Sequence, residues 1–338
     1  GNRALLKPSE FGPETAALFA EVMPRYFAEE EVAVVTGGAA ISQQFAELPF
    51  DHLLFTGSTR IGAKVMQSAA KNLVPVTLEL GGKSPVVIGR SAKVELAGTR
   101  LTFGKLLNGG QLCLSPDYVL VPEELEAQLI ARVVSETQSM YPNITENTDY
   151  AGVFDERHFA RLQGYIDDAV AKGAKLTIVG ADKTRASEGN RRMPLHILQN
   201  VTEDMQVMHE EIFGPILPVM TYSDITEVPD KIEPRRNPLA LYYFGKDKAE
   251  QEYLLNHVPS GGACINDITL HYVQEDLPFG GVGASGMGAY HGPEGFRNMS
   301  HGRAIYSQTM IDILPIIGAR PPFGEKFRKN IGKILGAI

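Results

Sequence analysis

Two residues have side chains and surroundings suited to catalysis: Cys113 as a nucleophile and Glu79 as a general base. Cys113 ends the glycine-containing stretch Asn108-Gly109-Gly110-Gln111-Leu112-Cys113, where a substrate could reach the thiol and the backbone could approach it closely. A thiolate in such a loop is a nucleophile for carbonyl compounds. A lone cysteine is more often a small buried apolar residue, and Cys264 keeps that interpretation.

Glu79 lies in the apolar run Val76-Thr77-Leu78-Glu79-Leu80, which predicts a strand. A carboxylate at the end of such a strand is costly to bury without a partner. Ligands collect at the ends of parallel strands in open α/β sheets. Partial desolvation would raise the pKa of Glu79 and suit it to act as a general base. The alternative is an ordinary solvated glutamate.

Two glycine-rich turns could hold phosphate groups. Residues 57–62, Gly-Ser-Thr-Arg-Ile-Gly, follow a predicted strand and open a predicted helix, so free backbone N–H groups would face an anion. Ser58 or Thr59 could instead be an ordinary helix N-cap. Residues 281–286 match the dinucleotide pattern Gly-x-Gly-x-x-Gly, but no strand precedes them, and a glycine and a proline interrupt any helix after them. We therefore expect a flexible loop there.

The pattern around these residues predicts the scaffold that must position them. Short apolar runs alternate with helical patterns, which favours an α/β fold with a mainly parallel sheet. The expected strands are 32–35, 53–55, 76–80, 85–88, 118–121, 175–179 and 239–244. The expected helices are 60–73, 94–107, 123–139 and 156–172. Residues 182–192 are polar and predict a surface loop or hairpin.

Composition limits the classes of function. The 338 residues suggest about two domains, at ~150 residues each. With a net charge of −8, a nucleic-acid-binding face is not expected. Two cysteines cannot build a disulfide framework, which favours a reducing, cytoplasmic location. We expect no integral membrane span, because no apolar stretch approaches ~20 residues, and no signal peptide opens the chain.

The sequence lacks the motifs of several other classes of enzyme. The histidines are scattered without metal-ligand spacing, and neither a Walker loop nor a Gly-x-Ser-x-Gly elbow occurs, so we expect no metal, NTPase or serine hydrolase site.

Near the C-terminus, four cations interleave with apolar residues and predict a basic amphipathic helix; the cations are Lys326, Arg328, Lys329 and Lys333. This helix could contact a membrane surface or, as we favour, pack on its own domain or a partner subunit.

Six short motifs occur in a fixed order. They are Lys7-Pro8-Ser9-Glu10, Phe55-Thr56-Gly57-Ser58, Leu78-Glu79-Leu80-Gly81-Gly82-Lys83-Ser84-Pro85, Gly110-Gln111-Leu112-Cys113, Glu210-Glu211-Ile212-Phe213-Gly214-Pro215 and Pro278-Phe279-Gly280-Gly281. Together they resemble the NAD(P)-dependent aldehyde dehydrogenase superfamily, over residues 1 to about 308. Residues 237–244 and 286–292 are similar to its class 3-like branch, and most of all to bacterial coniferyl aldehyde dehydrogenases.

The resemblance implies oxidation of an aldehyde to its acid. Cys113 would form a thiohemiacetal, its backbone N–H partly holding the oxyanion, and then a thioester that Glu79 hydrolyses by activating water. The cofactor would be NAD, with NADP possible. The resemblance implies that Lys7 and Glu10 hold the adenosine ribose, Gly57 and Ser58 the pyrophosphate, and Glu211 and Phe213 the nicotinamide ribose. Further implied cofactor contacts are Ser9, Gly37 and Leu80.

The resemblance also implies an architecture. Residues 1–85 would be the later part of a Rossmann-like cofactor domain, 86–285 the catalytic domain, and 286–338 a C-terminal return and tail. The family's oxyanion-hole Asn would fall before Gly1, so we expect either a longer native protein or a truncated relative. A homodimer is implied as well.

Two other functions share part of this pattern. One is a catalytically silent, aldehyde dehydrogenase-like binding protein, which activity measurements would distinguish. The other is a thiol acyltransferase that makes an acyl-CoA; it would share the nucleophile but would not need Glu79, so the glutamate disfavours it. The resemblance suggests aromatic, coniferyl-type, or medium-chain aldehydes as substrates.

Overall fold

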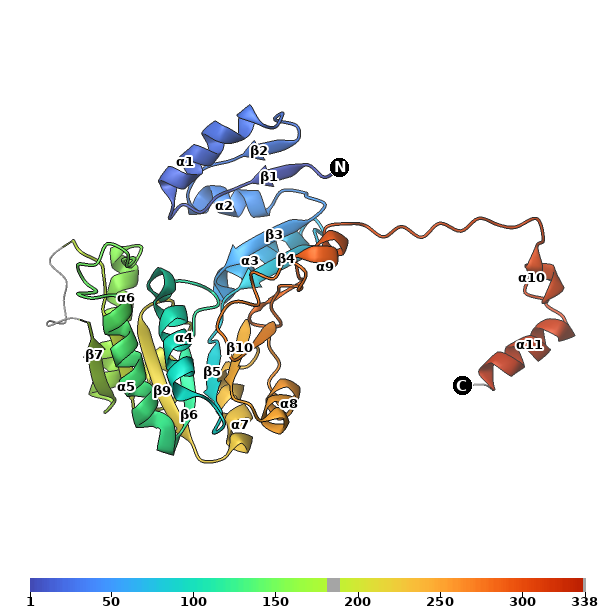
Figure 1. Ribbon diagram of the computed structural model, residues 1–338. Coiled ribbons are helices and arrows are strands. Elements are labelled where there is room, and N and C mark those ends of the chain that lie inside the picture. The colour runs from blue at the N-terminus through green and yellow to red at the C-terminus, as the bar shows by residue number, and fades with distance from the viewer. Residues whose placement is uncertain (181–188, 337–338) are drawn as a thin grey trace. The chain divides into compact units, whose positions relative to one another are not determined.

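The computed structural model describes residues 1–180 and 189–336, shown as a ribbon in Figure 1. The chain forms two compact units, Gly1–Met299 and a C-terminal unit that begins at Ser300.

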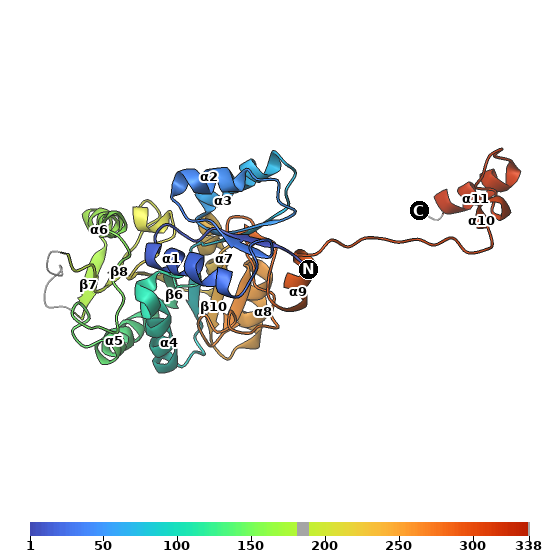
Figure 2. The ribbon, with the colours of Figure 1, turned by 90° about the horizontal axis from the view of Figure 1, so that it is seen from above.

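The first part of the larger unit holds two small sheets. Strands β1 (Ala4–Leu6) and β2 (Val32–Val34) pair in parallel. Strand β4 (Val76–Leu80) lies between the parallel β3 (Leu53–Gly57) and the antiparallel β12 (Gly286–Met287). The helices of this part are α1 (Pro13–Val22), α2 (Ala39–Ala46) and α3 (Thr59–Ala70). Helices α2 and α3 lie side by side in Figure 2, and a small apolar core fills the space between them and β3.

A seven-stranded sheet forms the second part, in the order β11-β10-β5-β6-β9-β8-β7. Its strands are β5 (Pro85–Ile88), β6 (Tyr118–Pro122), β7 (Lys175–Val179), β8 (Leu195–Gln199), β9 (Ile216–Tyr222), β10 (Ala240–Phe244) and β11 (Gly262–Ile265). All neighbouring strands are parallel except β7 and β8. The helices here are α4 (Val94–Leu106), α5 (Glu123–Met140), α6 (Glu156–Ala171), α7 (Val228–Ile232) and α8 (Lys248–His257), followed by α9 (Gly292–Asn298).

Helices cover both faces of this sheet, and its apolar strands explain why. On β5, Val86 and Ile88 pack into one core with Leu101 of α4. Val87, which points to the opposite face, packs into a second core with Leu162 of α6. A strand buried on both faces has a continuous apolar sequence, as β5 does. The arrangement confirms the predicted α/β fold.

Most of the predicted elements are confirmed. Strands β4, β5 and β7 match the expected residues, and the four expected helices end within a few residues of their predicted bounds. Part of the predicted loop, residues 182–188, lies outside the described residues. The flexible loop expected at 281–286 is wrong in part, because Gly286 begins β12 and pairs with Glu79 of β4.

The C-terminal unit contains α10 (Ile313–Ile316) and α11 (Glu325–Leu335), so the predicted basic helix is confirmed. The Asn330 side chain donates a 2.7 Å hydrogen bond to the Ile317 carbonyl, and the Phe323 and Phe327 rings lie 4.6 Å apart. Within the described residues, no helix is long and apolar enough to cross a membrane.

Candidate active site

The predicted cofactor residues follow the carboxyl ends of parallel strands. Lys7 comes directly after β1, Gly57 ends β3 and Leu80 ends β4. The Lys7 ammonium and the Glu10 carboxylate form an ion pair at 3.0 Å. The pKa of Glu10 is lowered, first by a backbone N–H and then by Lys7.

The turn between β3 and α3 fits a phosphate group. Ser58 occupies the N-cap position of α3, but its side chain makes no capping hydrogen bond. The Ile61 N–H donates to the Ser58 carbonyl at 3.0 Å, which leaves the N–H groups of Thr59 and Arg60 available to an anion. A Cβ on Gly57 would lie 2.6 Å from the Phe55 ring, so a larger residue at this position would have to displace that ring. The nearby Thr59 hydroxyl is used elsewhere, donating to the Ala284 carbonyl at 2.8 Å.

Glu79 is held between two strands and is almost fully buried, with 2% of its surface exposed. It lies opposite Thr56 of β3 on one side and Gly286 of β12 on the other. Its Oε1 atom has no hydrogen-bond partner among the described residues. Burial raises its pKa to about 7, partly offset by the Gly281 backbone N–H. A carboxyl that titrates near neutral pH suits a general base.

Cys113 follows α4 and a tight turn, and its side chain is half-buried. The turn requires Gly110, which has φ +75° and whose Cβ would lie 2.6 Å from the Gly214 carbonyl oxygen. Burial is the largest of the effects that raise the thiol pKa to about 11, and the carboxylates of Glu211 and Glu79 contribute to the rise. The backbone N–H groups of Cys113 and Leu114 lower it.

Glu211 completes this group of acidic and thiol side chains. Its carboxylate packs against the Cα of Gly81, where a Cβ would collide with it, and accepts a hydrogen bond from the Gly82 N–H. Burial raises its pKa to about 8. On α6, Arg161 donates to the Glu211 carbonyl at 3.2 Å, and His158 Nε2 lies 2.7 Å from the Phe213 carbonyl oxygen.

The structure thus brings the Cys113 thiol within electrostatic reach of both Glu79 and Glu211, and these three residues form the coupled group. Lys7 and Glu10 form their own pair after β1. A dinucleotide has two ends, and two groups at the carboxyl ends of parallel strands fit such an elongated ligand. In the described ranges, no group of three His, Cys, Asp or Glu residues could hold a metal ion.

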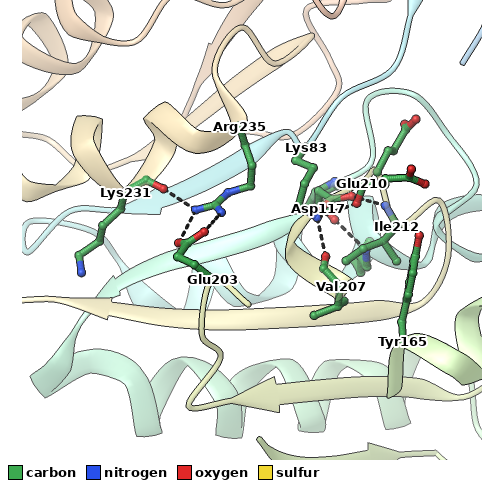
Figure 3. A network of polar contacts seen from close by, with 12 residues as sticks. Lys83, Asp117, Tyr165, Glu203, Val207, Glu210, Ile212, Lys231 and Arg235 are labelled. Carbon is green, nitrogen blue, oxygen red and sulfur yellow. Dashed lines mark hydrogen bonds and ion pairs between the residues drawn. The ribbon is translucent and has the colours of Figure 1, made fainter. Parts of the chain in front are cut away.

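The sequence interpretation missed residues that hold the site together. Lys83 and Asp117 form a buried ion pair (Figure 3). The Tyr242 hydroxyl of β10 donates to the Leu114 carbonyl at 2.7 Å, directly after Cys113. A signal was present for the ion pair, because a charged residue beside a fully apolar strand must find a partner.

Comparison with known proteins agrees with this geometry. The aldehyde dehydrogenase family profile matches residues 1–305. The chain is 48% identical to a probable coniferyl aldehyde dehydrogenase of Caulobacter vibrioides, covering 98% of this chain and 68% of the relative. It is 44% identical to a coniferyl aldehyde dehydrogenase of Pseudomonas sp., covering 99% and 70%.

A solved structure shares the fold. The substrate-bound state of Staphylococcus aureus AldH superposes with a TM-score of 0.89 at 37% identity, covering 99% of this chain and 71% of that one. The chain therefore belongs to the aldehyde dehydrogenase family, whose members oxidise aldehydes with a nicotinamide cofactor, and it is an enzyme of that activity.

Proposed function

We propose that Cys113 is the nucleophile and Glu79 the general base of this oxidation. The supporting observation is that the half-buried Cys113 thiol lies within electrostatic reach of Glu211 and of the buried Glu79 on β4. The sulfur adds to the aldehyde carbonyl, and the resulting oxyanion is held partly by the Cys113 backbone N–H. When bound, the nicotinamide supplies the hydride acceptor. Glu79 then removes a proton from the water that hydrolyses the thioester to the acid.

The proton of the thiol must be accounted for. A thiol pKa of about 11 means that Cys113 is protonated at neutral pH before substrate arrives. Attack on the carbonyl therefore requires transfer of this proton to a base. Glu211 and Glu79 are the two carboxylates whose charges act on the thiol, so either of them can accept this proton. Glu79, with a pKa of about 7, is ionised in about half of the molecules at pH 7.

We propose an aromatic, coniferyl-type aldehyde as the substrate. The names of the two relatives support it. So does an aromatic cluster beside the nucleophile, in which Phe279 lies 5.5 Å from the Tyr290 ring and 4.9 Å from the Tyr272 ring. Charges on Glu79 and Cys113 contribute to the raised pKa of Tyr290, so this ring is near both. Offset or edge contacts with such rings favour an aromatic ligand.

We propose NAD rather than NADP as the preferred cofactor. Lys7 and Ser9 accompany Glu10 at the end of β1, where an ionised carboxylate accepts hydrogen bonds from a ribose 2′-hydroxyl and repels a 2′-phosphate. Gly37, Leu80 and Phe213 would complete the contacts with the cofactor.

A homodimer is proposed from family resemblance. Both cysteines are free thiols, which suits the cytoplasmic location we propose.

The test compares Cys113→Ala with Cys264→Ala. Coniferyl aldehyde oxidation, followed by NADH absorbance, should be lost in the Cys113 variant and largely preserved in the Cys264 variant. Cys264 is a suitable control because it is also half-buried and packs against the same core. Retained oxidation in the Cys113 variant would refute the assignment of the nucleophile.

A further inference from the structure

The buried ion pair of Lys83 and Asp117 joins three separate segments of the chain (Figure 3). The Lys83 ammonium also donates to the carbonyl oxygens of Val207 at 2.8 Å and Glu210 at 3.0 Å. Asp117 Oδ1 accepts a 2.8 Å hydrogen bond from the Ile212 N–H. Lys83 is 4% exposed and Asp117 2%, so neither charge is solvated by bulk water.

Each of the three segments carries one residue of the coupled group. Lys83 follows Glu79 by four residues, and Asp117 follows Cys113 by four. Glu211 lies between the carbonyl that Lys83 binds and the N–H that Asp117 binds. A displacement of either partner would therefore shift the base, the nucleophile and Glu211 relative to one another.

Neighbouring contacts fix the Cys113 loop but join fewer of these segments. The Lys105 ammonium donates to the Pro116 carbonyl at 2.9 Å, and the Asp117 N–H donates to the Ser84 carbonyl at 2.9 Å. Lys105 connects the loop only to α4, and the Ser84 contact connects it only to the start of β5. Of these three contacts, the Lys83–Asp117 pair is the one that also binds the segment that carries Glu211.

Stability does not explain a buried pair of this kind. The desolvation of two charges offsets most of their attraction, and apolar replacements of such pairs are often neutral or stabilising. Hydrogen bonds between charged groups are short and directional, however, so they fix geometry. We propose that Lys83 and Asp117 are positioning residues that hold the thiol, the base and Glu211 in register for catalysis and cofactor binding. The inference rests on the proposed roles of these three residues.

The experiment compares Asp117→Asn, the double variant Lys83→Met/Asp117→Asn, and Glu203→Gln as a control. The double variant leaves no unpaired buried charge, so it separates positioning from the cost of burying a lone ammonium. Glu203 pairs with Arg235, whose guanidinium lies over the Tyr118 ring at 5.1 Å, in the same network but without contact to the Cys113 loop. Readouts are the melting temperature, the NAD dissociation constant from calorimetry, and kcat with KM for aldehyde.

The double variant should melt near the unaltered protein, yet bind NAD about 10-fold more weakly and lose about 10²-fold in kcat, the effect expected of a misplacement of about 1 Å. Its KM for aldehyde should change much less. Glu203→Gln should retain NAD affinity and kcat.

Three outcomes would overturn the proposal. The first is a folded double variant with unaltered NAD affinity and kcat. The second is loss of the fold in both Asp117 variants. The third is a loss of NAD affinity and kcat in Glu203→Gln as large as that in the double variant. An error in the assignment of the nucleophile can be told apart from an error in this proposal. If Cys113→Ala stayed active, weakened NAD binding in the double variant would still show that the ion pair positions the segment that carries Glu211.

Discussion

The Glu79→Gln substitution should stabilise the protein at alkaline pH, although it removes the proposed base. Glu79 has a pKa of about 7 in the fold, against 4.5 for an ordinary glutamate. The folded protein therefore binds this proton more tightly than the unfolded chain does. Ionisation of Glu79 opposes folding increasingly as the pH rises from about 4.5 to about 7, and fully above that.

The size of the effect follows from the pKa difference. One pKa unit corresponds to 1.36 kcal/mol, so the cost of the ionised carboxylate reaches about 3 kcal/mol at pH 8. At pH 5 most of the folded protein is protonated at Glu79, and the cost falls to about 1 kcal/mol. Glutamine is neutral and can still accept the Gly281 N–H, so it avoids this cost.

The assay is urea unfolding of the variant and the unaltered protein at pH 5 and pH 8, followed by circular dichroism. The stability gain of Glu79→Gln should be larger at pH 8. Glu30→Gln, at an exposed turn position, is the control and should change stability by less than about 0.5 kcal/mol at either pH. A gain independent of pH, or a loss at pH 8, would show that the buried carboxylate is not the source of the effect.

Three further outcomes are expected. In Glu79→Gln, a burst of NADH equal to the enzyme should precede a steady rate reduced by about 10²–10⁴-fold; loss of the burst would assign Glu79 to thiol deprotonation instead. In the unaltered protein, the steady rate limited by hydrolysis should rise about tenfold per pH unit below about 7 and level off above it, and a flat profile there would contradict the base role. The ratio of kcat/KM with NAD to that with NADP should exceed one and fall in Glu10→Gln; an unchanged ratio would place cofactor selection elsewhere.

The sequence predicts those elements that a short stretch of neighbouring residues determines. Strands β4 and β5 are apolar runs bounded by turn residues, and both were predicted residue for residue. Strand β9 is absent from the predicted strands; it contains Pro218, and a proline makes the local pattern atypical of a central strand. Strand β12 has two residues, and only its pairing with β4 makes it a strand.

The same distinction holds for the site. Motif spacing indicated Cys113 and Glu79, and the fold brings them together. The raised pKa of the thiol was not foreseen, because it depends on burial and on the charge of Glu211, far away in the chain. The partnership of Lys83 and Asp117, 34 residues apart, likewise required the folded structure. Sequence identifies the charged groups, whereas packing decides their partners.

The pairing of β12 with β4 has a consequence for biosynthesis. The strand that bears Glu79 is closed on one edge by Gly286, and Thr77 in the same strand accepts a hydrogen bond from Asn298, 221 residues later. Gly286, at φ +139°, approaches the Leu78 carbonyl too closely for any side chain. On the ribosome, this strand must therefore wait with an open edge until the chain has been extended by about another 200 residues, as far as Gly286 and Asn298. A nascent chain that ends before Gly286 therefore cannot complete the surroundings of Glu79.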